Sequence, residues 1–179
     1  EISYFTKRDQ LGYLSLAYLL TNDKKYFNAI INRIWSILEE TFWTVPAHAI
    51  YANNDPIPDL TTTGKVDLFA AATARQLSEC YLLFKEDMED LSPNLVRQLK
   101  RSVTDRAIYP VMAGRALDHS WLNGRGNWSV WCASNILAAG IALLDEPREC
   151  AVLVKLLNET VDKFIGFYPA DGYCDEGPM

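Results

Sequence analysis

The sequence has few of the residues that break regular structure or bind metals. Its 179 residues include 9 glycines, 8 prolines, 4 cysteines and 2 histidines, while 49% are hydrophobic. This apolar fraction excludes a disordered chain, and the length excludes a mini-protein held together by disulfides. No apolar run reaches the roughly 18 residues that a membrane span requires. We therefore expect one domain over residues 1–179 with a sizeable core and no membrane contact.

Metal-binding and redox motifs are also missing. The cysteines stand far apart, at positions 80, 132, 150 and 174, and form no C-x-x-C pair and no Cys/His cluster of zinc spacing. Cys80, Cys132 and Cys150 fall within apolar helical patterns, which predicts buried thiols. Cys174 fits either a loop thiol or a disulfide partner. The sequence thus predicts no metal site and no cofactor.

Hydrophobic periodicity predicts helices throughout the chain, and no strand pattern competes with it. The expected helices cover residues 7–20, 23–42, 67–84, 92–109, 128–144 and 146–167. Asp23 and Ser92 are the expected N-caps of the second and fourth helices. The fourth helix is expected to end or kink near Tyr109, before Pro110.

Charge divides these helices into two groups. No charged residue lies between Gln10 and Leu20 or between Trp128 and Leu144, whereas the second, fourth and sixth helices are amphipathic. A helix that is apolar all round is buried on all sides, and an amphipathic one has a face in water. The first, third and fifth helices are therefore expected to be inner and the others outer. This predicts an all-α fold of about three antiparallel hairpins in an incomplete (α/α) toroid, with a plain three-hairpin bundle as the alternative.

The long connections are expected to gather at one end of such a ring, which we call the rim. They cover residues 43–66, 113–127 and the chain from 168 onward, and long loops in compact domains usually carry function. The inner helices begin at the rim, so their N-terminal N–H groups favour an anionic ligand. The rim holds both histidines, several aromatic and amide side chains and several acids: His48, His119, Trp43, Trp121, Asn127, Tyr173, Asp55, Asp59, Asp118, Asp171, Asp175 and Glu176.

The net charge of -6 hides a basic stretch, because residues 97–125 contain six basic and two acidic side chains. Those on the outer helix fit a solvated surface, whereas Arg115 and Arg125 lie in the loop and are candidate contacts for an anion. Asn127 fits either an N-cap of the fifth helix or a ligand-binding amide. Trp128 fits either a core residue or a stacking platform for a sugar. The polar loop around Trp121 favours a ligand-facing role for that residue over a place in the core.

Four motifs in order resemble the heparinase II/III-like proteins, which include polysaccharide lyases acting on heparin, heparan sulfate and alginate. These motifs are Thr41–His48, Val66–Ala70 before an alanine-rich helix, Gly126–Cys132 and Asp171–Pro178. The resemblance covers essentially the whole chain. It implies the N-terminal part of an α/α toroid, with further helices and a β-sandwich region beyond residue 179, in a parent protein that is periplasmic or secreted by a bacterium.

The chemistry that the resemblance implies is β-elimination on a uronate. Asn127 matches the asparagine that neutralises the carboxylate in related alginate lyases, where the next residue is histidine; here that residue is Trp128. His48 or His119 would then supply an imidazole. The implied substrate contacts on an anionic polysaccharide are Trp121, Trp128, Arg115, Arg125, Tyr173 and Glu176. Because the family's catalytic tyrosine falls beyond Met179, we expect this piece alone to be inactive.

Two other functions remain open. A toroid hydrolase of the unsaturated-glucuronyl kind needs two carboxylic acids in the cleft, and Asp67, Asp118, Asp171 and Glu176 are the candidates. A non-catalytic helical scaffold would instead bind protein or carbohydrate on its concave face. The net negative charge and the absence of a known nucleic-acid recognition motif argue against nucleic acid binding. An open end of the ring is expected to expose apolar surface and to promote self-association.

Overall fold

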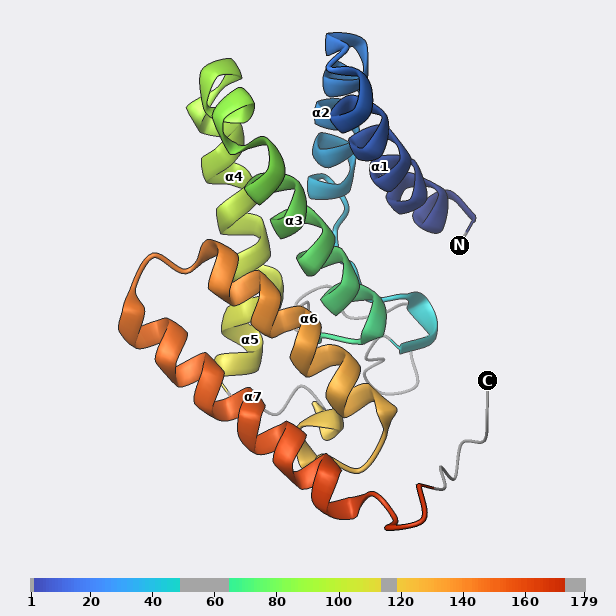
Figure 1. Cartoon of the computed structure of the whole chain (residues 1–179), viewed down its shortest axis with the longest axis vertical. Coiled ribbons are helices and arrows are strands. Elements are labelled where there is room, and N and C mark those ends of the chain that lie inside the picture. The colour runs from blue at the N-terminus through green and yellow to red at the C-terminus, as the bar shows by residue number, and fades with distance from the viewer. Residues whose placement is uncertain (1, 49–64, 114–118, 173–179) are drawn as a thin grey trace.

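The computed structural model describes residues 2–48, 65–113 and 119–172 (Figure 1). Across these ranges the regular elements are all helical, so the expected all-α class is confirmed. Arg115, Tyr173 and Glu176 lie outside the described residues, as do Cys174 and the acids at 55, 59, 118 and 175. None of the described helices is long and apolar enough to cross a membrane.

The main helices follow one another as pairs in the chain. α1 (Ile2–Thr21) pairs with α2 (Lys24–Leu38), α3 (Leu68–Leu91) with α4 (Pro93–Val103), and α6 (Asn127–Leu143) with α7 (Pro147–Phe167). Both expected caps are confirmed, since Asp23 accepts a hydrogen bond from the Lys25 N–H and Ser92 accepts one from the Leu95 N–H. Short, locally capped turns therefore connect the helices of the first two pairs.

α1, α3 and α6 begin at the same end of the molecule. α1 and α3 run parallel, because contacts join Tyr4 to Thr73 near their starts and Tyr18 to Asp87 near their ends. α6 lies beside α3 (Figure 1), and its Trp131 indole donates to the carbonyl of Leu68 at the start of α3, 3.2 Å away. The N-terminal ends of three helices therefore face one region, as the rim requires.

Several helix boundaries differ from the prediction, and α1 begins at Ile2, five residues before the expected start. α2 ends at Leu38, four residues early, and α3 continues to Leu91 past Phe84, whose φ of -126° and ψ of 21° mark a kink. The fourth helix was expected to end or kink near Tyr109. The chain instead leaves α-helical geometry earlier, in the π-helical turn η4 (Thr104–Ile108), and stays helical through α5 (Tyr109–Met112). Pro110 lies in the first turn of α5, directly after the π-helical turn, whose last hydrogen bond joins the Tyr109 N–H to the Thr104 carbonyl.

The expectation that α1 and α6 are buried on all sides is wrong within the described residues. Tyr13 and Leu20 of α1 are 73% and 76% exposed, and Ile141 of α6 is 62% exposed. No described element covers these side chains, so an apolar composition did not predict burial on every side of the helix.

The cysteines differ in burial: Cys80 and Cys132 are buried as expected, whereas Cys150 is partly exposed. Burial raises the pKa of the Cys80 thiol to about 11.

Candidate functional site

Asp67 organises the start of α3. Its side chain is 0% exposed, and its Oδ1 accepts hydrogen bonds from the N–H groups of Phe69 and Ala70 at 3.1 and 2.8 Å. Its Oδ2 faces the Val45 N–H at 3.3 Å and the Nδ1 of His48 at 2.8 Å. A buried carboxylate is stable only when its oxygens are bonded in this way. Asp67 therefore caps α3 and holds the loop that carries His48.

His48 ends the short helix η1 (Pro46–His48) and presents one edge of its ring to Asp67. A carboxylate at Nδ1 holds a proton on that nitrogen and leaves Nε2 as the proton acceptor of the neutral ring. The side chain is 27% exposed. It stacks on Phe69, with centroids 5.9 Å apart and planes at 11°, and meets the Trp128 ring edge-on at 4.8 Å. The imidazole is thus oriented from three sides.

These rings continue into a longer series, which we call the aromatic row: Phe5, Phe69, His48 and Trp128. Phe5 of α1 lies 5.3 Å from Phe69 of α3 between ring centroids. The row therefore crosses the N-terminal ends of α1, α3 and α6, and every one of its side chains keeps some exposed surface. Exposed aromatic faces at a shared helix end suit stacking against the apolar faces of sugar rings.

His119 and Trp121 contact the backbone at the start of α3. The Val66 N–H donates to Nε2 of His119 at 3.0 Å, and the Trp121 indole N–H donates to the Val66 carbonyl at 2.9 Å. Both side chains are buried. We therefore assign His119 and Trp121 to fixing the backbone that leads into Asp67, rather than to a ligand.

Asn127 and Arg125 lie on the exposed side of this region. Asn127 is the first residue of α6, because Gly126 occupies the N-cap position and makes no side-chain cap bond. Asn127 is an exposed residue and precedes Trp128 in the chain, and the Trp128 ring contacts that of His48. Arg125 is also exposed, and its guanidinium lies 5.3 Å from the centre of the Phe167 ring. The structure thus brings Trp128 and His48 into contact, and Asn127 begins the helix that carries Trp128.

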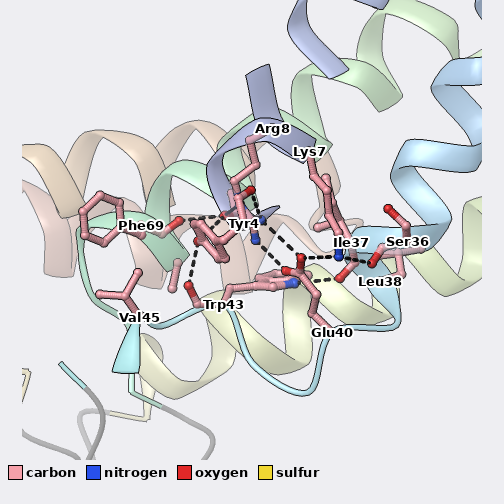
Figure 2. A network of polar contacts seen from close by, with 12 residues as sticks. Tyr4, Lys7, Arg8, Ser36, Ile37, Leu38, Glu40, Trp43, Val45 and Phe69 are labelled. Atoms are coloured by element: carbon pink, nitrogen blue, oxygen red, sulfur yellow. Dashed lines mark hydrogen bonds and ion pairs between the residues drawn. The ribbon is translucent and has the colours of Figure 1, made fainter. Parts of the chain in front are cut away.

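A network that the sequence did not predict supports α1 at the rim (Figure 2). The Arg8 guanidinium lies 3.3 Å over the Tyr4 ring, donates to Thr73 Oγ1 at 2.7 Å and pairs with Glu40 at 2.7 Å. The Tyr4 hydroxyl donates to the Trp43 carbonyl at 2.7 Å. Burial raises the pKa of Tyr4 to about 12. Only the apolar spacing of α1 was visible in the sequence, whereas these partners are 32 to 69 residues away.

The basic stretch behaves as a solvated outer helix. Lys100 pairs with Asp145 at 2.6 Å, and Arg101 pairs with Asp105 at 3.3 Å. Arg106 donates to the carbonyls of Leu38 and Glu40, and Arg97 donates to Asn94. Each of these four cations therefore has a partner that is not a member of the aromatic row.

Within the described ranges, no group of three or more His, Cys, Asp or Glu side chains is arranged to hold a metal ion. Comparison with models of known protein families and with curated proteins finds no match. The arrangement of the rim residues themselves is thus the basis for any functional assignment. A fixed imidazole with an acceptor nitrogen can take part in proton transfer, and a row of partly exposed rings can stack against a ligand.

Proposed function

We propose that the chain forms the N-terminal part of an α/α toroid in a polysaccharide lyase that cleaves uronate-containing polymers by β-elimination. One observation carries the proposal: the Asp67-bound imidazole of His48 lies within the aromatic row, in contact with the ring of Trp128, which follows the exposed Asn127 in the chain. The pairing of helices and the common start of α1, α3 and α6 support the toroid.

The reaction requires removal of a weakly acidic proton from the carbon next to the uronate carboxylate. The electron pair of that C–H bond forms a carbon–carbon double bond, the bond to the glycosidic oxygen breaks, and an acid protonates the leaving oxygen. Asn127 is assigned to the carboxylate, where an amide donor stabilises the negative charge that develops. His48 is assigned as the base, since its Nε2 is the acceptor of a ring whose other nitrogen faces Asp67.

The hydrolase alternative receives less support. It needs two carboxylic acids facing the bond that is cleaved. Asp67 is buried with both oxygens bonded to neighbouring groups, so it is not available to protonate a glycosidic oxygen. Asp171 lies in an exposed turn after α7.

The proposal is tested on the full-length parent protein with heparin, alginate and hyaluronan as substrates. The ultraviolet absorbance of the unsaturated uronate product reports β-elimination directly. Asn127→Ala and His48→Ala are each expected to lower kcat at least a hundredfold, the usual effect of removing one group that acts in the transition state. Asn32→Ala, on the exposed surface of α2, is the matched control and retains activity. Full activity in Asn127→Ala, or no unsaturated product from any polymer, overturns the proposal.

A further inference from the structure

A groove of about 490 Å³ lies between α1 and α3 and extends the site. Phe5 and Phe69, two members of the aromatic row, also line this groove. A polymer that stacks on the row at His48 can therefore continue over these two rings into the groove. Tyr4, whose bonds appear in Figure 2, lines the same end.

The groove combines an exposed ring with polar groups. Tyr13 is 73% exposed and lines it one helical turn beyond Asp9 on α1. Gln76 lies opposite, and its amide nitrogen donates to the Arg8 carbonyl at 2.7 Å. An aromatic face flanked by carboxylate, amide and guanidinium groups suits a pyranose ring, which is apolar on its faces and hydroxylated at its edge.

The charges of the groove select against an anionic sugar. Its lining includes two cations and two anions: Arg8, Arg75, Asp9 and Glu79. Arg8 is bound to Glu40, and Arg75 donates to Glu79 at 2.7 Å. Asp9 has no ion pair among the described residues. Both cations of the lining thus already have an acidic partner, whereas the Asp9 carboxylate has none within the described ranges and would repel a sugar carboxylate or sulfate.

We propose that this groove binds an uncharged pyranose unit next to the uronate that reacts at His48 and Asn127. The polymer then alternates uronate with an uncharged sugar, and runs of uronate or sulfated units are disfavoured. This inference rests on the proposed lyase function for the neighbouring uronate, but the groove itself is tested by binding, without catalysis.

The experiment measures calorimetric affinities of the 179-residue chain for three hexasaccharides. The probes are fragments of hyaluronan, which alternates glucuronate with an uncharged sugar, of alginate, which is uronate throughout, and of chitin, which is uncharged throughout. The wild-type chain is expected to bind the hyaluronan fragment more tightly than the alginate fragment. Tyr13→Ala is expected to lower the affinity for the hyaluronan fragment about tenfold, because one stacked ring is lost.

Asp9→Asn separates charge from shape. The affinity for the alginate fragment is expected to rise about threefold, because the change removes one partly screened repulsion. The affinity for the hyaluronan fragment is expected to stay within about twofold of the wild-type value. Trp35→Ala removes an exposed ring on α2 that does not line this groove, and should change neither affinity.

The outcomes distinguish the two proposals. Equal affinities of wild type and Tyr13→Ala for all three fragments, or a wild-type preference for alginate, overturn the groove while leaving the lyase test untouched. A parent protein that produces no unsaturated uronate, combined with a Tyr13-dependent affinity for the chitin fragment, overturns the lyase and sustains the groove. Absence of binding of all three fragments to the wild-type chain overturns the groove.

Discussion

Asp67 is the residue on which the proposed site most depends. Its two oxygens accept bonds from the first turn of α3, from the Val45 N–H and from the His48 ring. Asp67→Ala leaves these donors without their acceptor in a buried place. We expect the free energy of unfolding to fall by about 3 kcal/mol, from the lost cap and the unpaired N–H groups. Urea denaturation measures it, and Asp23→Ala, an exposed cap of α2, should cost less.

Asp67→Asn keeps the cap of α3 and changes only the oxygen that faces the His48 ring and the Val45 N–H. The amide oxygen can still cap α3, but an NH₂ group replaces Oδ2 and donates to Nδ1, which moves the ring proton to Nε2. Nitrogen NMR shifts of His48 are expected to report this exchange of tautomers while α3 stays folded. An unchanged tautomer in a folded Asp67→Asn chain contradicts the assigned hydrogen bond.

Tyr4 makes stability sensitive to alkaline pH. Its folded-state pKa is raised by burial to about 12, whereas an unfolded tyrosine titrates near its ordinary pKa of 10.0. Below pH 10 both states hold the proton; above it only the unfolded chain loses the proton, so this contribution to stability declines up to pH 12. Tyr4→Phe should therefore lose less stability than wild type between pH 9 and 11 in urea denaturation. Parallel pH profiles of the two proteins would contradict the raised pKa.

At the scale of elements, the sequence was informative where the cause of structure is local. The caps at Asp23 and Ser92 were predictable because each bonds to an N–H two or three residues away. The π turn before Pro110 was not, since proline indicates a break without saying how the preceding turns adjust. His119 and Trp121 were expected at a ligand, but their partner Val66 lies 53 and 55 residues away. Periodicity carries no information on such a pairing.

Gly124 follows η5 (Ser120–Asn123) in the chain and packs against α7. Its φ is +76°, and a Cβ there would lie 2.5 Å from the Lys163 Cβ and 3.0 Å from the backbone of Thr160 and Phe164. Gly124→Ala is expected to cost about 2 kcal/mol or more in unfolding free energy, because backbone atoms must move and the left-handed conformation is strained. Gly166→Ala, in open space on α7, is the control and should be neutral or stabilising. An equal effect of the two changes would rule out the close approach.

At the scale of the whole molecule, the helix class and pairing followed from periodicity, whereas the rim chemistry did not. The aromatic row needed Phe5, Phe69, His48 and Trp128 to come from separate segments. Of these four residues, the sequence singled out only His48 and Trp128 as candidates for the site. The exposed side chains of α1 and α3 change in character along these helices. Asp9, Arg75 and Glu79 line the groove near the aromatic row, whereas Leu16, Leu20, Leu82 and Leu83, nearer the C-terminal ends of the two helices, are exposed.

This apolar end predicts self-association of the isolated chain. Leu16 and Leu20 lie one turn apart on α1, Leu82 and Leu83 are adjacent on α3, these two helices are in contact, and exposed apolar side chains on adjoining elements favour association. Light scattering at micromolar to millimolar concentration is expected to show species larger than a monomer. Leu16→Lys combined with Leu20→Lys should return the chain to a monomer without lowering its melting temperature, because both side chains are already more than half exposed. Val152→Lys, on the exposed surface of α7, should leave association unchanged. A wild-type chain that stays monomeric across this range would contradict both the association and the proposal that further toroid helices cover this end.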